Sequence, residues 1–331
     1  MKLQERISLL GRLGDYMLSE NPDWVEVRER ATRENAWFIP EFTSLAIRNI
    51  VSRFLQPATL AGWAASYHIT EENTAPKNVG IVMAGNIPLV GFHDWLAVFI
   101  SGHIAVVKPS SKDKVLFTHL MGVLEGFDPR AGSRTLIQDM LKNCDAYIAT
   151  GSNNSAGYFD YYFSRYPHII RRNRSSVAIL DGSETDTELS ALADDIMLYF
   201  GLGCRNVTKL LVPRDYDFLP LVNALKKYDY LADHNKNKNN YDYNLALHIL
   251  NKQYYMSTPS VLLVEQESVF SPISQVNYSF YGDASAAVTA LNPNDLQCLI
   301  GKSHTPFGQA QYPSLNDYAD GVDTLAFLTK L

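Results

Sequence analysis

The stretch of residues 199–209 places one cysteine in a loop of small residues, where a thiol could act as a nucleophile. A helix-like segment, residues 188–200, precedes this loop, and a β-branched run follows it. Gly201 and Gly203 allow a tight turn, which would leave the thiol of Cys204 open at the end of an element. An isolated cysteine can equally be a small buried hydrophobic residue, so the rest of the chain must decide between the two interpretations.

Small and polar residues also follow three predicted strands upstream, in positions suited to a nucleotide. These residues are Asn86; Lys108, Pro109, Ser110 and Ser111; and Gly151 with Ser152. Lys108 could reach a phosphate or ribose, and Gly151 and Ser152 at a helix start could offer backbone N–H groups to a pyrophosphate. Each group alone could be an ordinary turn, because turns are made of the same residue types. Their recurrence at successive strand ends indicates a nucleotide site, although no GxGxxG fingerprint follows any strand.

The elements that must position these residues alternate between strand and helix. Amphipathic helices are predicted at residues 7–18 and 42–55, and they are expected to cover a sheet or close over a cleft. Further strands are predicted at 79–83, 104–107, 146–150, 168–171 and 176–180, with helices from Pro88 to Ile100 and over 112–124. This alternation predicts a doubly wound parallel sheet that binds ligands at the carboxyl ends of its strands.

A second α/β domain follows the same rules. Its predicted helices are 186–200, 218–227, 241–251 and 285–291, and its predicted strands are 207–212, 261–264, 275–280 and 298–300. The segment 233–240 is rich in Asn and Lys and is predicted to be an exposed loop. The predicted domains are therefore residues 1–175, with N-terminal helices and the nucleotide site, and residues 176–302, with the nucleophile. Residues 303–331 are predicted to be a docking or oligomerisation tail.

Composition excludes several classes of protein. The chain has 331 residues, of which 46% are hydrophobic and 19% are charged, as in a soluble globular protein with two domains. A net charge of -6 without a basic stripe argues against a nucleic-acid partner. No apolar run is long enough to span a bilayer, and the N-terminus has no apolar signal core, so the cytoplasm is the expected compartment.

The cysteines and histidines predict neither a disulfide framework nor a metal site. The three cysteines are scattered, and no histidine spacing matches a zinc motif. Cys144 and Cys298 are expected in the core. His103 is expected to turn the chain, and His93 and Asp94 to cap or pack a helix. His304 could donate a proton in the cleft or be structural.

Five ordered pieces of the chain resemble the aldehyde dehydrogenase superfamily, and within it the LuxC-like fatty acyl-CoA reductases. They span roughly residues 78–300. The pieces are Ala84-Gly85-Asn86-Ile87-Pro88-Leu89, similar to "WNFPL"; Ser101 to Ser110, similar to "AGNTVVLKPS"; Thr150-Gly151-Ser152, similar to "TGS"; Gly201-Leu202-Gly203-Cys204, similar to "GQxC"; and Glu267-Ser268-Val269-Phe270-Ser271-Pro272, similar to "EEIFGP".

The resemblance implies a fold and a set of roles. The fold is two doubly wound α/β domains with a cleft between them, preceded by a helical region. Cys204 would be the nucleophile, and Asn86 would donate to the oxyanion. Lys108, Pro109, Ser110 and Ser111 would line the adenosine site, Gly151 and Ser152 the nicotinamide half, and Glu267 and Phe270 would contact the cofactor as well. Members usually dimerise or tetramerise through a C-terminal extension.

The departures from the family pattern narrow the implied reaction. Arg171 or a neighbour stands where "ELGGK" supplies the glutamate that activates a hydrolytic water. An enzyme without that glutamate makes carboxylates poorly, but needs no such water when the acyl group enters or leaves as a thioester. Ser268 occupies the place of the ribose-binding glutamate, with Glu267 beside it. Ser111 stands where NAD-specific members place a carboxylate, so the resemblance favours NADPH, with NADH possible.

The implied activity is reduction of an acyl-CoA thioester to an aldehyde through a cysteine acyl-enzyme. Two alternatives stay open at this point. One is a catalytically degenerate subunit of a fatty-acid-processing complex, and the other is a cysteine acyltransferase or thioesterase that uses no nicotinamide. Retention of Asn86 together with Cys204 argues against the first, and the pieces around Lys108 and Gly151 argue against the second.

Overall fold

The computed structural model describes residues 1–151 and 153–331, and the side chains of residues 153–155 are not described. The chain forms two compact units. The first unit comprises Met1–Asn173 and Pro313–Leu331, and the second comprises Arg174–Tyr312. The predicted tail, residues 303–331, therefore divides between the two units. Its docking or oligomerisation role stays a prediction.

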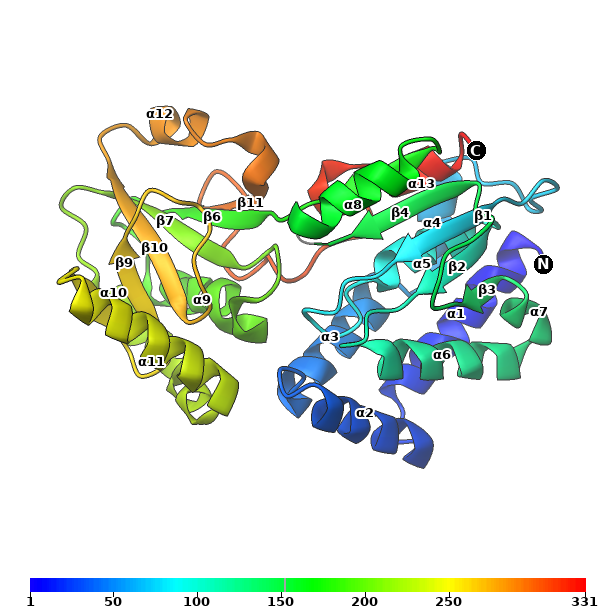
Figure 1. Ribbon diagram of the computed structural model, residues 1–331, viewed down its shortest axis with the longest axis horizontal. Helices are drawn as coiled ribbons and strands as arrows, with labels where there is room; N and C mark the ends of the chain where they lie inside the picture. Colours follow the sequence, from blue (N-terminus) through cyan, green and yellow to red (C-terminus); the bar gives the residue numbers. More distant parts are fainter. Residues whose placement is uncertain (152) are drawn as a thin grey trace. The chain divides into compact units, whose positions relative to one another are not determined.

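The first unit is a five-stranded parallel sheet with helices (Figure 1). Its strands are β1 (Asn78–Val82), β2 (Ile104–Lys108), β3 (Thr135–Ile137), β4 (Ala146–Thr150) and β5 (His168–Arg171). Their order is β3-β2-β1-β4-β5, with every neighbouring pair parallel. From β1 the chain continues to β2 and β3 on one side of the sheet, and from β4 it continues to β5 on the other side. The direction in which successive strands are added therefore changes between β1 and β4. In doubly wound sheets this switch point is where ligands bind.

Helices of the first unit cover this sheet and join its core. They are α1 (Leu3–Leu18), α2 (Pro22–Glu34), α3 (Pro40–Arg53), α4 (Pro57–Ser66), α5 (Phe92–Ser101), α6 (Lys114–Phe127), α7 (Pro129–Gly132), α8 (Asn153–Phe163) and α13 (Thr324–Leu328). Leu10 and Leu13 of α1 share one core cluster with Val79 and Ile81 of β1, so the N-terminal helices cover the sheet as predicted. Crossovers in opposite directions place α5 and α6 on one face and α8 on the other.

The second unit holds a six-stranded sheet. Its strands are β6 (Ser175–Ile179), β7 (Val207–Pro213), β8 (Tyr255–Ser257), β9 (Leu262–Glu265), β10 (Gln275–Tyr281) and β11 (Leu296–Ile300). The order is β11-β6-β7-β10-β9-β8, parallel except for the edge strand β8. The accompanying helices are α9 (Asp186–Met197), α10 (Leu219–Leu225), α11 (Asn235–Leu250) and α12 (Ala284–Thr289). Short 3₁₀ segments lie at Leu198–Gly201, Lys226–Asp233, Pro293–Asp295 and Ala319–Gly321, the last in the first unit.

Three sequence predictions about elements are wrong. Residues 233–240 are not an exposed loop, because α11 begins at Asn235 and the amide of Asn237 is buried, where it donates to Leu231 O at 3.2 Å. Pro88 does not open a helix: α5 begins at Phe92, and Pro88 lies in the turn before it. The helix predicted to reach Phe200 ends at Met197, because Leu198 leaves the helical conformation with a ψ of 141° and the backbone turns left-handed at Tyr199.

Candidate functional site

The loop that carries Cys204 is bent by three consecutive residues in the left-handed region. The φ angles are 55° at Tyr199, 57° at Phe200 and 71° at Gly201. A side chain in this region costs about 1–2 kcal/mol, so Tyr199 and Phe200 stay there only because packing compensates. Both side chains are buried. Only Gly201 of the two predicted turn glycines supplies a left-handed conformation.

Asn206 ties this loop together from the inside. Its side chain is fully buried, and its Oδ1 accepts a hydrogen bond from the backbone N–H of Gly203 at 2.8 Å. Its Nδ2 donates to three carbonyl oxygens at the end of α9: Leu198 at 2.8 Å, Asp195 at 3.0 Å and Ile196 at 3.3 Å. The last carbonyls of a helix have no partner within the helix, so one amide satisfies them and also fixes the turn before Cys204.

Cys204 itself is half-buried, in the turn between Gly203 and β7. Its carbonyl accepts a hydrogen bond from Ser176 Oγ at 3.0 Å, which attaches the loop to β6. The structure thus places Cys204, a half-buried residue, on a short loop whose backbone is anchored at both ends. Nucleophilic catalysis requires a thiol held in this way, because the attacking atom must be accessible and oriented.

Asp195 joins α9 to the segment that follows His304. The carboxylate accepts from Gly308 N at 2.6 Å and from Ala310 N at 3.0 Å, and burial raises its pKa to about 7. Gly308 has a φ of 79°, and a side chain there would come within 2.9 Å of Ala191 Cβ, so only glycine fits. His304 is exposed in the turn before this segment.

The other two cysteines differ from one another. Cys144 is buried against Val106 and Tyr147, as predicted for a core residue. Cys298 is only half-buried, and Arg205 donates to its Sγ at 3.3 Å, so its predicted core position is wrong.

Two predicted cofactor residues, Glu267 and Phe270, lie on the segment between β9 and β10 of the second unit. Glu267 is exposed and Phe270 is half-buried. The Ser268 hydroxyl donates to the carbonyl of Phe270 at 2.9 Å and accepts from its N–H at 3.1 Å, which closes a tight turn between the two residues. This turn leaves the Glu267 carboxylate open to solvent.

In the first unit, the sheet brings the predicted strand-end groups to one edge. Asn86 follows β1 and is exposed, Lys108 ends β2, and Ser111 and Lys112 lie exposed in the turn after it. The N–H of Met83 donates to Lys108 O at 3.1 Å and continues the β1–β2 pairing beyond the sheet. These groups therefore lie at the carboxyl ends of neighbouring strands, as predicted.

A close packing contact holds the loop after β1 against the turn after β2. A side chain on Gly85 would come within 2.5 Å of Ser110 Oγ, so this position requires glycine. The backbone N–H of Leu89, whose φ is 57°, donates to Asp113 Oδ2 at 2.6 Å. Burial raises the pKa of Asp113 well above its usual range. The loop that presents Asn86 is thus anchored on both sides of that residue.

The third strand end is only partly described. Gly151 directly follows β4, and its N–H donates to Arg171 O at 3.4 Å, while α8 begins at Asn153. Ser152, also predicted to bind the cofactor, lies outside the residues that the structure describes.

Arg171, which the sequence places near the general-base position, is a buried structural residue. Its Nη2 donates to Asp94 Oδ1 at 2.6 Å and to Thr324 Oγ1 at 2.7 Å, and its Nη1 donates to the carbonyl of Ala319. Arg171 therefore fastens the C-terminal segment to α5 within the first unit. Because its side chain is 2% exposed, the guanidinium is not available to a substrate.

Two nearby histidines have a similar structural role. His93 hydrogen-bonds to Leu315 O at 3.0 Å, and the buried His103 hydrogen-bonds to Leu328 O at 3.1 Å. The chain turn expected at His103 is made by Gly102, whose φ is 78°. His93 and Asp94 are packing groups, as predicted.

Residues 41–218, more than half of the chain, match the sequence model of one protein family, the LuxC acyl-CoA reductases. The chain belongs to this family. A sequence search of curated proteins found no match.

Solved structures that share this fold include aldehyde dehydrogenases. One, from Mycobacterium tuberculosis and complexed with NAD+, is 14% identical with a TM-score of 0.64, and the match covers 87% of this chain and 70% of that one. Aldehyde dehydrogenase 21 from Physcomitrella patens, in complex with the product succinate, is 13% identical with a TM-score of 0.66, over 91% and 74% of the two chains. At these identities the likeness establishes the aldehyde dehydrogenase fold, and with the family it supports an oxidoreductase of the acyl-CoA reductase or aldehyde dehydrogenase type.

Sequence patterns do not single out the residues that position the loops of Cys204 and Asn86. Asn206 and Asp113 stand in ordinary turn sequences, where Asn and Asp are common, and only their burial and their partners distinguish them. Lys209 is the last residue of the cysteine stretch and no motif marks it, although its side chain is 1% exposed. A lysine in a β-branched strand is the one signal that could have drawn attention to it.

Within the part of the chain that the structure describes, no helix combines the length and the apolar character needed to cross a membrane.

Proposed function

We propose that this LuxC-family chain reduces an acyl-CoA thioester to an aldehyde, with NADPH as reductant and Cys204 as the acyl carrier. The observation that carries the proposal is the half-buried Cys204 on a loop that Asn206 anchors. The thiolate attacks the thioester carbonyl, CoA leaves as its thiol, and the acyl group stays on sulfur. The reduced nicotinamide supplies a hydride to the acyl carbon. Aldehyde and the Cys204 thiolate are then released, so acyl-CoA, NADPH and a proton give aldehyde, CoA and NADP+.

Asn86 and the backbone N–H of Cys204 are proposed to hold the negative charge that develops on the carbonyl oxygen. A donor of this kind contributes about 10²–10³ in rate. Asn86 suits this role because its loop is fixed by Gly85 against Ser110 and by Leu89 on Asp113. A donor that needs no reorganisation during the reaction stabilises the oxyanion more than a mobile one.

The preference for NADPH rests on charge at the end of β2. Lys108 and Lys112 are exposed there, and Ser111 between them carries no charge. A 2′-phosphate would meet two exposed cations in this turn, whereas the carboxyl of Asp113 in the same turn is buried and accepts from Leu89 N, so the donor set fits NADPH. NADH lacks that phosphate, so the two lysines would favour its binding less. Pro109, Ser110, Gly151, Ser152, Glu267 and Phe270 complete the proposed cofactor contacts.

The state of Arg171 supports thioester chemistry over hydrolysis. Arg171 or a neighbour stands where the superfamily pattern supplies the general base, and the guanidinium of Arg171 is paired with Asp94. A permanently charged arginine cannot take a proton from water. Transfer of the acyl group from CoA to Cys204 needs no such water, because one thioester is converted into another.

The test combines two signals measured on the same sample. Purified protein is mixed with NADPH and acyl-CoAs of several chain lengths, and cofactor oxidation is followed together with free CoA. Matched oxidation and CoA release support the reductase. Release without oxidation indicates an acyltransferase or thioesterase, and neither signal indicates a degenerate subunit. Cys204→Ala should abolish both signals and Cys298→Ala should keep them, whereas full activity of Cys204→Ala would refute the assignment.

A further inference from the structure

The segment that carries Glu267 and Phe270 is held by side chains from the sheet beneath it. Thr208 Oγ1 donates to Val269 O at 2.6 Å, and Asn277 Nδ2 donates to Ser268 O at 2.9 Å and to Phe270 O at 3.0 Å. Lys209 Nζ donates to the carbonyl of Gln266. Three side chains of β7 and β10 therefore bind four main-chain carbonyls of this segment, which we call the 266–270 segment.

Lys209 is the unusual member of this set. Its side chain is 1% exposed, whereas lysines are almost never fully buried unless they are paired. Lys209 and Asn277 lie opposite each other in the β7–β10 register, so both reach the same face of the sheet. An apolar side chain could fill this position without the cost of burying an ammonium. The structure explains the lysine only through the 266–270 segment.

The charges around Lys209 point to the same segment. Burial lowers the pKa of Lys209 to about 8, while Glu267 and Glu265 act in the opposite direction and favour the charged form. These two carboxylates are the charged groups whose electrostatic attraction acts on the ammonium. One of them, Glu267, is the proposed cofactor contact. Lys209 thus combines a hydrogen bond to the main chain before Glu267 with an electrostatic attraction to the Glu267 side chain.

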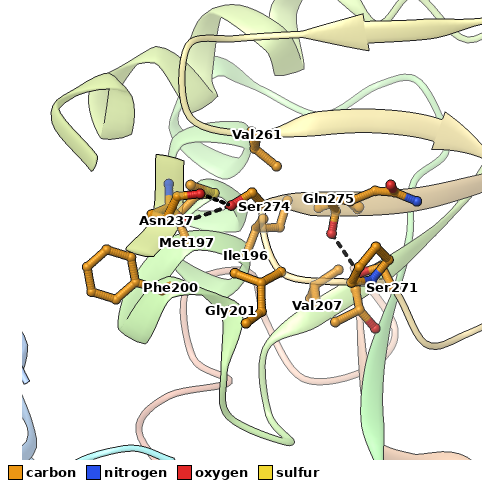
Figure 2. A pocket seen from close by; sticks show the side chains of 14 residues that line it. Ile196, Met197, Phe200, Gly201, Val207, Asn237, Val261, Ser271, Ser274 and Gln275 are labelled. Carbon is orange, nitrogen blue, oxygen red and sulfur yellow. Dashed lines mark hydrogen bonds between the residues drawn. The ribbon is translucent and has the colours of Figure 1, made fainter. Parts of the chain in front are cut away.

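The outer side of the 266–270 segment remains accessible. Glu267 is exposed, and an open hollow there is lined by Gln253, Tyr254, Glu265, Gln266 and Glu267. A separate cavity of about 50 Å³ lies near Gly201 and Val207 (Figure 2). The sheet holds the main chain from below, so the Glu267 side chain can meet a ligand without the segment having to order first.

We propose that Lys209 is a positioning residue, which fixes the 266–270 segment and with it Glu267 and Phe270 for cofactor binding. Thr208 and Asn277 hold the same segment through their own hydrogen bonds. This inference rests on the proposed use of a nicotinamide cofactor. Lys209 touches neither the acyl group nor the thiol in this scheme. Its loss should therefore weaken cofactor binding and leave acyl transfer to Cys204 intact.

The experiment compares Lys209→Met, Lys209→Arg and Thr208→Val with the exposed control Lys226→Met. Two quantities are measured: the KM for NADPH in the complete reaction, and the rate of CoA release from acyl-CoA without NADPH. Loss of a hydrogen bond from a charged donor predicts that Lys209→Met raises the KM about tenfold. CoA release should stay within about twofold of the wild type, since no bond to the acyl group is lost. Thr208→Val should raise the KM less, and Lys226→Met should leave it unchanged.

The pH profile separates positioning from simple packing. Above pH 8 the wild-type ammonium loses its proton, so the KM for NADPH should rise with pH. Lys209→Arg should abolish this rise, because a guanidinium stays charged. Lys209→Met should show a high KM at every pH. If Lys209→Met does not fold, two other results test the inference: the smaller increase in the KM for NADPH in Thr208→Val, and the pH-independent KM for NADPH in Lys209→Arg.

The inference is overturned if Lys209→Met leaves the KM unchanged, or if it slows CoA release as much as NADPH oxidation. Equilibrium titration with NADPH distinguishes this failure from failure of the proposed function. Wild-type protein that binds NADPH but releases no CoA refutes the reductase, while tenfold weaker binding by Lys209→Met still supports the inference. Wild-type protein that binds neither NADPH nor NADH overturns both.

Discussion

Asn206 offers the sharpest test of how the cysteine loop is held. Replacing it with alanine removes four hydrogen bonds and leaves the carbonyls of Leu198, Asp195 and Ile196 and the N–H of Gly203 without this partner. A buried polar group that loses its bond costs about 1–3 kcal/mol. Because water can replace some of the lost bonds, we expect the free energy of unfolding to fall by about 3–5 kcal/mol, a large share of the usual 5–15 kcal/mol.

Asn206→Asp tests the orientation of the amide with almost no change in volume. One carboxylate oxygen can still accept from Gly203 N, but the other would face three carbonyl oxygens where Nδ2 now donates. Burial and this repulsion should raise the pKa of the introduced carboxyl. A carboxyl with a raised folded-state pKa contributes stability at low pH and loses it as the pH rises. Asn206→Asp should therefore be as unstable as Asn206→Ala at pH 8 and recover partly at pH 5.

Urea unfolding followed by circular dichroism measures these differences, with the exposed Asn239→Ala as the control. The control should stay within about 0.5 kcal/mol of the wild type. CoA release from acyl-CoA should fall roughly a hundredfold in Asn206→Ala under conditions where it is still folded, because a small misplacement of the nucleophile has such an effect. If Asn206→Asp is as stable as the wild type at pH 8, the assigned orientation of the Asn206 amide is wrong. If Asn206→Ala loses no more free energy of unfolding than Asn239→Ala, Asn206 does not anchor the loop.

Two further predictions concern cofactor choice and pH. Ser111→Glu should raise the KM for NADPH about tenfold relative to that for NADH, because a carboxylate would repel the 2′-phosphate; an unchanged preference in steady-state kinetics would place that phosphate elsewhere. The pKa of Asp195 is raised from 3.8 to about 7, so between these values the folded state holds a proton that the unfolded state has lost. The free energy of unfolding should therefore fall as the pH rises from 5 to 7, by about 2 kcal/mol more in the wild type than in Asp195→Asn. Parallel pH profiles in urea titrations would contradict the assignment.

The architecture could be predicted from the sequence because its signals are local. Short β-branched runs such as residues 104–107, followed by turn residues and a helical pattern, identify a parallel sheet, and the order of the five superfamily pieces identifies the fold. The grouping of Asn86 and Lys108 at one edge follows, since parallel strands end on the same side. These predictions needed no knowledge of distant contacts.

The predictions that failed concern residues whose positions depend on contacts with parts of the chain that are distant in sequence. Residues 233–240 have the composition of a loop, yet Asn237 is held by Ser274, which is distant in sequence and donates to it at 2.8 Å. Packing of this kind overrides local propensity. Arg171 likewise pairs with Asp94 and Thr324, which lie far away in opposite directions along the chain. No local pattern predicts that such a residue is buried.

The most direct test of the account is the covalent state of Cys204. Protein is incubated with a long-chain acyl-CoA without cofactor, and its peptides are mapped by mass spectrometry before and after NADPH is added. We expect one acyl group on Cys204, formed with release of one CoA and discharged as aldehyde when NADPH is added. An acyl group on Cys298 instead, or CoA release that persists in Cys204→Ala, would contradict it.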